Sequence, residues 1–253
     1  MSFNFSNVII VLASSIFIYC SLYSLNKIRT MWMEYPDLEE LYHVDDQYLI
    51  GSDLLVKPVV HPGVTEIEVQ FPADHIWYDV DTMSKMPVGD GIVKVVPLTV
   101  SSGIDKIPVY QRGGSIIPRK LRLRRSTQMM SDDPYTIYIA LDSAQKAFGE
   151  IYMDDEDSFD HERKGSFAKA NLSADISTSI RCEVEGSGEW IESQPEGVKH
   201  IERVVIMGLG KAPKKLFVDS VELEFNYDAD NQVLVIPTRK SISALKDWEI
   251  FIE

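Results

Sequence analysis

Apolar and polar positions alternate with a period of two along most of the chain. Ile67, Val69 and Phe71, for example, are separated by polar residues, which is typical of an antiparallel strand with one face in water. Comparable strands are predicted at residues 76–80, 92–100, 107–110, 115–117, 135–141, 150–153, 180–184, 201–207, 216–218, 221–225, 233–236 and 248–252. Glycine, proline and aspartate separate these segments, so the pattern predicts antiparallel β-sandwiches.

The first 60 residues follow other patterns. Residues 54–60 are almost continuously apolar, as expected for a strand that is buried on both faces. Leu38, Leu41 and Tyr42 are spaced i, i+3 and i+4, which predicts one or two helical turns at residues 37–42. The period-two alternation begins only after residue 63.

Two adjacent glycines, Gly113 and Gly114, stand between the apolar runs 107–110 and 115–118. Paired glycines supply the positive φ angles that a tight reversal needs. Pro108 and Pro118 cannot donate to a strand ladder, so each is expected at a strand end or edge. The stretch from 107 to 118 therefore predicts a β-hairpin.

The N-terminal segment has a different character. Its uncharged run begins at Val8 and ends at Leu25, which is near the lower limit for a spanning helix and long for the core of a signal peptide. No Lys or Arg precedes the run, whereas Lys27 and Arg29 follow it, and this fits a signal peptide poorly. The alternatives are a membrane anchor with the rest of the chain in the cytosol, or a truncated start whose leader is foreign to the folded protein.

Composition excludes several classes of protein. The net charge of −14 argues against a nucleic-acid partner, because such proteins need a basic surface to neutralise phosphates. Cys20 and Cys182 are the only cysteines, so no intrachain disulfide framework is expected. No Cys and His spacing suggests a metal site, and none is predicted.

Four motifs occur in the order that glycoside hydrolase family 31 has them. They are Asp46-Gln47-Tyr48 with the apolar run 54–59, Trp77-Tyr78-Asp79, the run from Ile107 to Pro118, and Tyr152-Met153-Asp154-Asp155 with Ser158-Phe159. The resemblance extends from Arg29 to Glu253. Within the family, the chain most resembles the α-glucosidases that process glycoproteins in the endoplasmic reticulum.

The resemblance implies a mainly β fold in four parts. Residues 1–28 form a hydrophobic leader of doubtful origin, and residues 29–60 are the end of a catalytic (β/α)8 barrel. Residues 61–125 are expected to form a proximal β-sandwich, and residues 126–253 a distal one. A complete barrel takes about 200–250 residues, so most of it is missing from this match.

The function implied by the resemblance is removal of glucose from N-glycans by retaining hydrolysis, without a cofactor. In the family both catalytic aspartates precede the region that matches Arg29, and the nucleophile lies in a Trp-x-Asp-Met-Asn-Glu motif. Trp77-Tyr78-Asp79 shares only the Trp-to-Asp spacing of that motif, so Asp79 is not the nucleophile. No catalytic, substrate-binding or metal-binding residue is therefore expected here. A β subunit is the implied partner, and the lumen of the endoplasmic reticulum the implied location.

Three groups of polar residues have a functional and a structural interpretation. Asn171-Leu172-Ser173 is an N-glycosylation sequon, which requires a lumenal chain. Residues 154–157 are all acidic but lack the spacing of a calcium loop, and Glu156 stands where the family usually has glycine, which predicts an altered turn. The basic stretch 119–125 is expected to be a solvated linker rather than an anion-binding patch. The acidic pairs 45–46 and 132–133 are expected in turns.

Two alternatives belong to other classes of protein. A carbohydrate-binding β protein would need a platform of exposed aromatic rings, for which Trp77, Tyr135, Tyr152 and Trp190 are the candidates. A membrane-tethered interaction protein depends only on the apolar run near the N-terminus.

Overall fold

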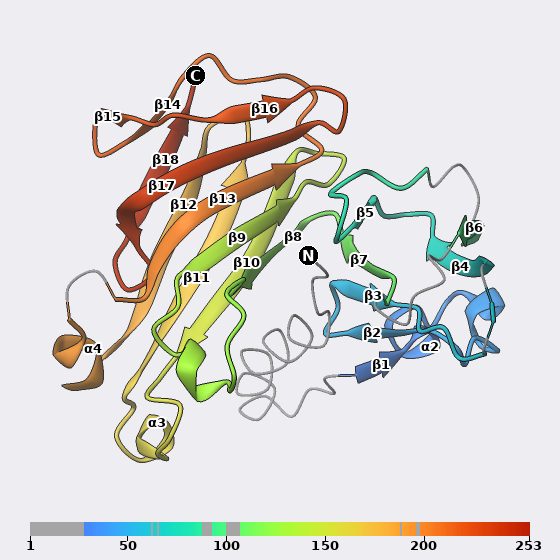
Figure 1. The fold of residues 1–253 in the computed structure, drawn as a ribbon, viewed down its shortest axis with the longest axis horizontal. Coiled ribbons are helices and arrows are strands. Elements are labelled where there is room, and N and C mark those ends of the chain that lie inside the picture. The colour runs from blue at the N-terminus through green and yellow to red at the C-terminus, as the bar shows by residue number, and fades with distance from the viewer. Residues whose placement is uncertain are drawn as a thin grey trace.

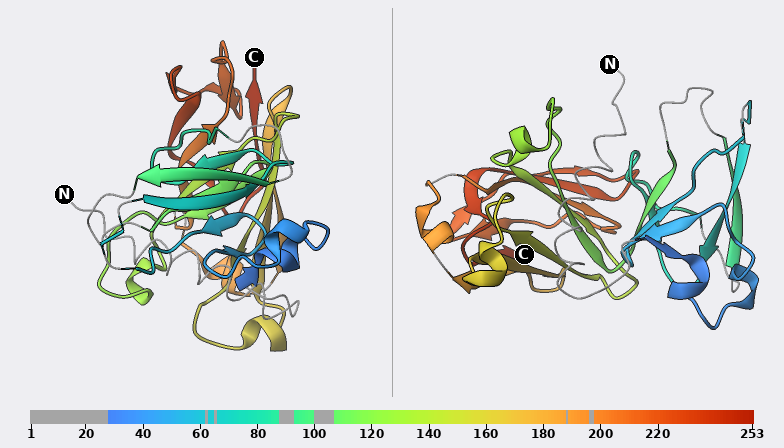
Figure 2. Two further views of the ribbon diagram at one scale, coloured as in Figure 1. Left: turned by 90° about the vertical axis from the view of Figure 1, so that its right-hand side faces the viewer. Right: turned by 90° about the horizontal axis from the view of Figure 1, so that it is seen from below.

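The computed structural model describes residues 28–253 except 62, 65, 88–92, 100–106, 188 and 196–197, so the apolar run near the N-terminus lies outside it. The predicted mainly β fold is confirmed: each helix of the described chain has only three to five residues. No helix in these ranges is both long and apolar enough to cross a bilayer. The strands form two bodies that lie side by side in Figures 1 and 2.

The first body contains a five-stranded sheet and a separate two-stranded sheet. The five strands are, in spatial order, β1 (Ile28–Thr30), β2 (Tyr48–Ile50), β3 (Leu54–Val56), β7 (Val109–Arg112) and β5 (Trp77–Asp79). The other sheet pairs β4 (Glu66–Pro72) with β6 (Val93–Thr99). Two short helices, α2 (Met31–Glu34) and η1 (Glu39–Leu41), place Met31 and Leu41 in one apolar cluster with residues of both sheets, and η1 confirms the helical turn predicted at 37–42.

The second body is one sheet of eleven strands. Its order is β15 (Val221–Glu222), β14 (Leu216–Val218), β18 (Trp248–Ile252), β12 (Ser179–Ser187), β11 (Phe167–Asp175), β10 (Lys146–Met153), β8 (Ser115–Arg119), β9 (Tyr135–Ala140), β13 (His200–Met207), β17 (Val233–Ser243) and β16 (Asn226–Asp228). The sheet curls into two facing layers, which Figure 2 shows. Short helices η2 (Gln128–Met130), α3 (Asp160–Arg163) and α4 (Glu189–Ser193) lie in its connections.

The layers enclose one apolar core to which strands from both halves contribute. Alternate residues of β13 face opposite sides of the sheet, and one of these sides contacts the first body. Val204 and Ile206 point into the core, whereas Val205 and Met207 belong to a second cluster that includes Tyr78 of β5. A strand that is buried on both faces needs a continuous apolar run, and β13 has one.

The predicted hairpin at residues 107–118 is wrong. β7 pairs with β3 and β5 in the first body, whereas β8 pairs with β9 and β10 in the second. Gly113 and Gly114 therefore carry the chain from one sheet to the other, and Gly114 has a φ of 90°. A Cβ atom on Gly113 would lie 2.8 Å from the Leu141 carbonyl oxygen, so only glycine fits this crossing. The change of sheet precedes the sequence-based domain boundary at residue 125.

Candidate functional site

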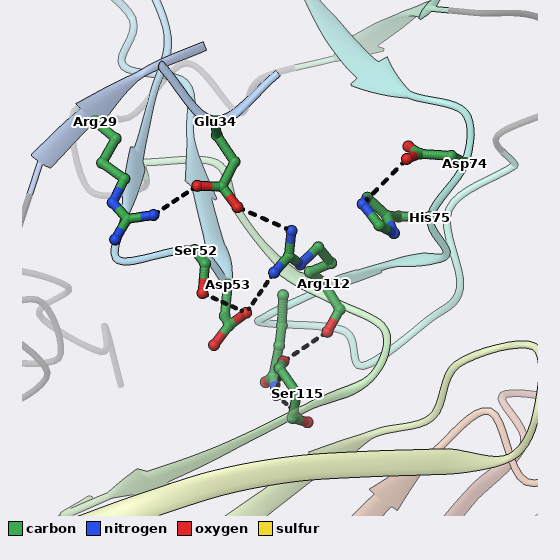
Figure 3. A network of polar contacts seen from close by, with 9 residues as sticks. Arg29, Glu34, Ser52, Asp53, Asp74, His75, Arg112 and Ser115 are labelled. Carbon is green, nitrogen blue, oxygen red and sulfur yellow. Dashed lines mark hydrogen bonds and ion pairs between the residues drawn. The ribbon is translucent and has the colours of Figure 1, made fainter. Parts of the chain in front are cut away.

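Arg112, the last residue of β7, lies at the centre of an ion network in the first body (Figure 3). Its Nη1 is 3.2 Å from Glu34 Oε1 at the end of α2, and its Nη2 is 3.2 Å from Asp53 Oδ1 between β2 and β3. Arg29 of β1 also contacts Glu34, at 2.6 Å. Two arginines thus neutralise two carboxylates, and the network joins β7 to α2, to β1 and to the turn between β2 and β3.

The surroundings of this network keep Arg112 charged. Burial opposes the charged form, but Tyr35, Asp53 and Glu34 outweigh it and hold the pKa of Arg112 above its ordinary value. Burial raises the pKa of Tyr35 to about 12, so this residue stays neutral at physiological pH. Burial also lowers the pKa of His75, whose ring lies 5.9 Å from that of Tyr35. A charge-balanced network of this kind fixes elements relative to one another.

A second set of polar residues holds together the region where the chain passes from the first body to the second. Buried Gln111 donates through Nε2 to Tyr138 O at 3.1 Å and accepts through Oε1 from Arg119 Nη2 at 3.0 Å. The Arg119 guanidinium lies 3.9 Å from the centre of the Tyr138 ring, and burial lowers its pKa to about 10. Tyr78 adds a hydrogen bond from its hydroxyl to Leu141 O, at 2.8 Å. Polar groups with buried partners make this junction specific.

Two lysines converge on the loop that precedes β9. Lys120 Nζ donates to Met130 O at 2.8 Å and to Ser131 O at 3.0 Å, and Lys199 Nζ also donates to Ser131 O, at 2.5 Å. Glu156 Oε1 lies 3.4 Å from Lys199 and 3.8 Å from Lys120. Burial and then the nearby Lys199 lower the pKa of Lys120 to about 8. This arrangement was not predicted, because Lys120 was assigned to the solvated basic stretch at 119–125 and Lys199 has no distinctive neighbours in the sequence.

The acidic loop at residues 154–157 is built from turns. Asp154 Oδ1 accepts a hydrogen bond from the backbone amide of Glu156, and Asp155 accepts from the backbone amide and the hydroxyl of Ser158. Glu156 has a φ of 60°, so the backbone adopts the left-handed conformation that glycine favours, although the residue is glutamate. Within the part of the chain that the structure describes, no group of three or more His, Cys, Asp or Glu residues could hold a metal ion.

The aromatic residues that a sugar platform would need are mostly inside the protein. Trp77 is fully buried and donates from Nε1 to Pro72 O at 3.1 Å. Tyr135 and Tyr152 are also buried, and Tyr152 stacks on Phe167 with ring centres 5.5 Å apart. Trp190 is half-buried and packs against the core of the second body. These four residues therefore do not form a common surface.

The basic stretch at 119–125 is a solvated linker only in part, because residues 121–125 are exposed and irregular. Arg119 and Lys120 are buried, and Arg124 clamps the buried carboxylate of Asp133 with bonds of 2.6 and 2.9 Å. The hydrogen bonds from Arg124 lower the pKa of Asp133. Arg122 contacts Glu202 at 3.3 Å. Arg119, Lys120, Arg122 and Arg124 thus have partners within the protein, which the sequence pattern could not reveal because these partners lie elsewhere in the chain.

The remaining predicted site residues lie on surfaces or in turns. Asn171 is half-exposed on the outer face of β11, and its Nδ2 donates to Glu185 Oε1 at 3.2 Å. Asp79 accepts hydrogen bonds from the backbone amides of Asp81 and Thr82, at 2.9 and 2.7 Å. Asp46 pairs with Lys57. Asp79 thus caps the turn that follows β5.

Comparison with known proteins gives a consistent family assignment. Residues 25–117 match the glycosyl hydrolase family 31 C-terminal domain. Neutral alpha-glucosidase AB of Dictyostelium discoideum is 41% identical over 214 residues, which cover 82% of this chain and 21% of that protein. The human protein of the same name is 34% identical over 230 residues, which cover 88% of this chain and 23% of that protein. The chain thus spans between a fifth and a quarter of these relatives.

Solved structures of glucosidase II alpha subunit have the same fold. The DNJ-bound form matches 99% of this chain with a TM-score of 0.81 at 24% identity, and the chain covers 28% of it. The Glc1Man2-bound form matches 96% with a TM-score of 0.80 at 25% identity, and the chain again covers 28%. The chain belongs to glycoside hydrolase family 31, and it corresponds to the C-terminal region of the α-glucosidases in that family.

Proposed function

We propose that this chain is the supporting C-terminal portion of an α-glucosidase that trims glucose from N-glycans by retaining hydrolysis. The Arg112 network carries the proposal. Its carboxylates come from the segment that resembles the end of the catalytic barrel, whereas Arg112 ends the strand that leads into the second body. An arginine shared by two carboxylates fixes geometry through directed bonds. The chain would thereby brace the end of the barrel.

The catalytic carboxylates would come from the part of the relatives that this chain does not match. A retaining glycosidase uses two carboxyl groups about 5–5.5 Å apart. Asp79 and Asp154 lie within family motifs, and both accept hydrogen bonds from backbone amides in turns. Glu34 and Asp53 are bound to Arg112. Because these carboxylates are held in turns or in ion pairs, they support the proposal that this portion of the enzyme carries out no catalysis itself.

A partner and a compartment follow from the same proposal. One matched structure is the heterodimeric complex of endoplasmic-reticulum glucosidase II, which contains the catalytic subunit and the binding domain of the regulatory subunit. We infer that a glucosidase II β subunit-like protein is the partner, and that the chain lies in the lumen of the endoplasmic reticulum. The half-exposed Asn171 would be accessible there as a glycosylation site.

The proposal can be tested on the purified chain with an aryl α-glucoside at high protein concentration. We expect no saturable hydrolysis, because without a nucleophile no glycosyl-enzyme intermediate forms, and without an acid the leaving oxygen is not protonated. Asp79→Asn and Asp154→Asn serve as matched variants. Saturable turnover that disappears in either variant would contradict the proposal, since it would reveal a catalytic carboxylate in a residue that we assign to a turn.

A further inference from the structure

A glycosylation sequon and an exposed phenylalanine lie together on the outer face of the second body. β10, β11 and β12 are neighbours in the sheet (Figure 1), and alternate residues of β11, including Asn171 and Ser173, are half-exposed on this face. Phe148 of β10 is directly opposite Ser173 and is 62% exposed. Phe148 is therefore the diagonal neighbour of Asn171, at a Cβ separation of about 7–8 Å that aromatic and long side chains can span.

The charged residues around Phe148 are paired with one another. Lys146 contacts Asp175 at 2.8 Å, and Lys169 contacts Glu150 at 2.7 Å, in each case between β10 and β11. One of these pairs lies on each side of Phe148 along the strands. A group that covered the exposed ring would therefore remove apolar area from water without breaking an ion pair.

The side-chain amide of Asn171 is oriented by a neighbour on the opposite side. Its Nδ2 donates to Glu185 Oε1 at 3.2 Å. Glu185 belongs to β12 and is level with Lys169. Phe148 belongs to β10 and is level with Ser173, so it lies across the opposite diagonal. The amide nitrogen has two hydrogens, and an N-linked sugar replaces one of them. Because Glu185 accepts one hydrogen, the sugar takes the place of the other, on the side of β10.

We propose that Asn171 carries an N-linked glycan whose first N-acetylglucosamine packs on the ring of Phe148. The inference rests on the lumenal location proposed above, because a sequon is used only in the secretory pathway. In the attachment step, the Asn171 nitrogen bonds to C1 of a sugar carried on a polyprenyl diphosphate. The bond from C1 to the diphosphate oxygen breaks, the diphosphate leaves with the electron pair, and the nitrogen loses a proton. The C–H face of the sugar then covers the negative face of the aromatic ring.

The first test is occupancy of the site in the full chain, produced in insect cells behind a cleavable secretory signal. The added signal delivers the chain to the lumen whatever its natural location, so a failure here would leave the proposed α-glucosidase role intact. After peptide N-glycosidase treatment in heavy-oxygen water, mass spectrometry of the tryptic peptide from Ala170 to Arg181 should show labelled aspartate in place of Asn171. Ser173→Ala should abolish the label. A secreted wild-type chain without label in this peptide would overturn the proposal.

The second test asks whether the glycan packs on Phe148. All variants carry Asn4→Gln, which removes the other sequon of the chain. The glycosylated chain is expected to have a Tm roughly 2–4 °C above that of its Asn171→Gln counterpart, and this difference should disappear in Phe148→Ala. Phe251→Ala is the matched control and should keep the difference, because Phe251 is also exposed on the outer face but belongs to β18, which β12 separates from β11. If the difference were absent from the wild type, or equally large in Phe148→Ala, the glycan would not pack on this ring.

Discussion

Replacing Arg112 by methionine is expected to lower the free energy of unfolding by about 2–3 kcal/mol. The change leaves Asp53 without its arginine and Glu34 with Arg29 alone. Breaking a buried or half-buried ion pair is costly, because the remaining charge keeps its desolvation penalty. Urea unfolding followed by fluorescence measures the effect, provided that the slope with denaturant stays unchanged.

Two variants serve as controls for this loss. Arg112→Lys keeps the charge but loses the fork that reaches two carboxylates, so about half of the effect is expected. Arg239→Met removes an ion pair with Glu224 in which both side chains are about three-quarters exposed, and it should cost less than about 0.5 kcal/mol. If Arg112→Met were as mild as Arg239→Met, the network would have no bracing role.

Lys120 is expected to make the stability of the second body rise with pH. Its pKa is about 8 in the folded protein, against 10.5 for the ordinary side chain. Between these two values the unfolded chain binds a proton that the folded chain has released, so the free energy of unfolding increases with pH. The penalty at pH 7 is roughly 3 kcal/mol; most of it should be lost by pH 10, and the rest above the unfolded pKa of 10.5.

The measurement is the difference in unfolding free energy between the wild type and Lys120→Met from pH 7 to pH 10. Subtracting the variant removes the contributions of buried tyrosines and of Cys182, whose raised pKa values act in the opposite direction. The wild type should gain about 2–3 kcal/mol relative to the variant across this range. A constant difference would mean that Lys120 titrates normally and is not desolvated.

The period-two pattern predicted most strands whose inward positions carry large apolar residues. It missed a strand whose inward positions are mostly small residues. β11 was missed, although its inward positions are Ala168, Ala170, Leu172 and Ala174, and every one of them is buried. Alanine has little preference for strands. It suits this position because β11 lies deep in the sheet between β10 and β12, where partner strands rather than local propensity decide the structure.

The predicted hairpin failed for a related reason. Local pattern shows that Gly113 and Gly114 form a bend, but it cannot show which partners the flanking strands choose. β7 pairs with β3 and β5 of the first body, whereas β8 pairs with β9 and β10 of the second. Likewise, the partners of Arg112 and Lys120 lie between 10 and 78 positions away, so spacing along the chain gives no signal for them. The resemblance to family motifs nevertheless identified the family of the stretch from Ile107 to Pro118 correctly.

The central claim is that this chain supports a barrel that does the chemistry. The most direct test replaces the matching region of the Dictyostelium neutral alpha-glucosidase AB with residues 28–253 and measures hydrolysis of an aryl α-glucoside. The chimera is expected to be active, with kcat/KM within about tenfold of the parent enzyme, and Arg112→Met is expected to lower the temperature at which this activity is lost. A chimera that folds and melts like the parent but has no activity would contradict the claim.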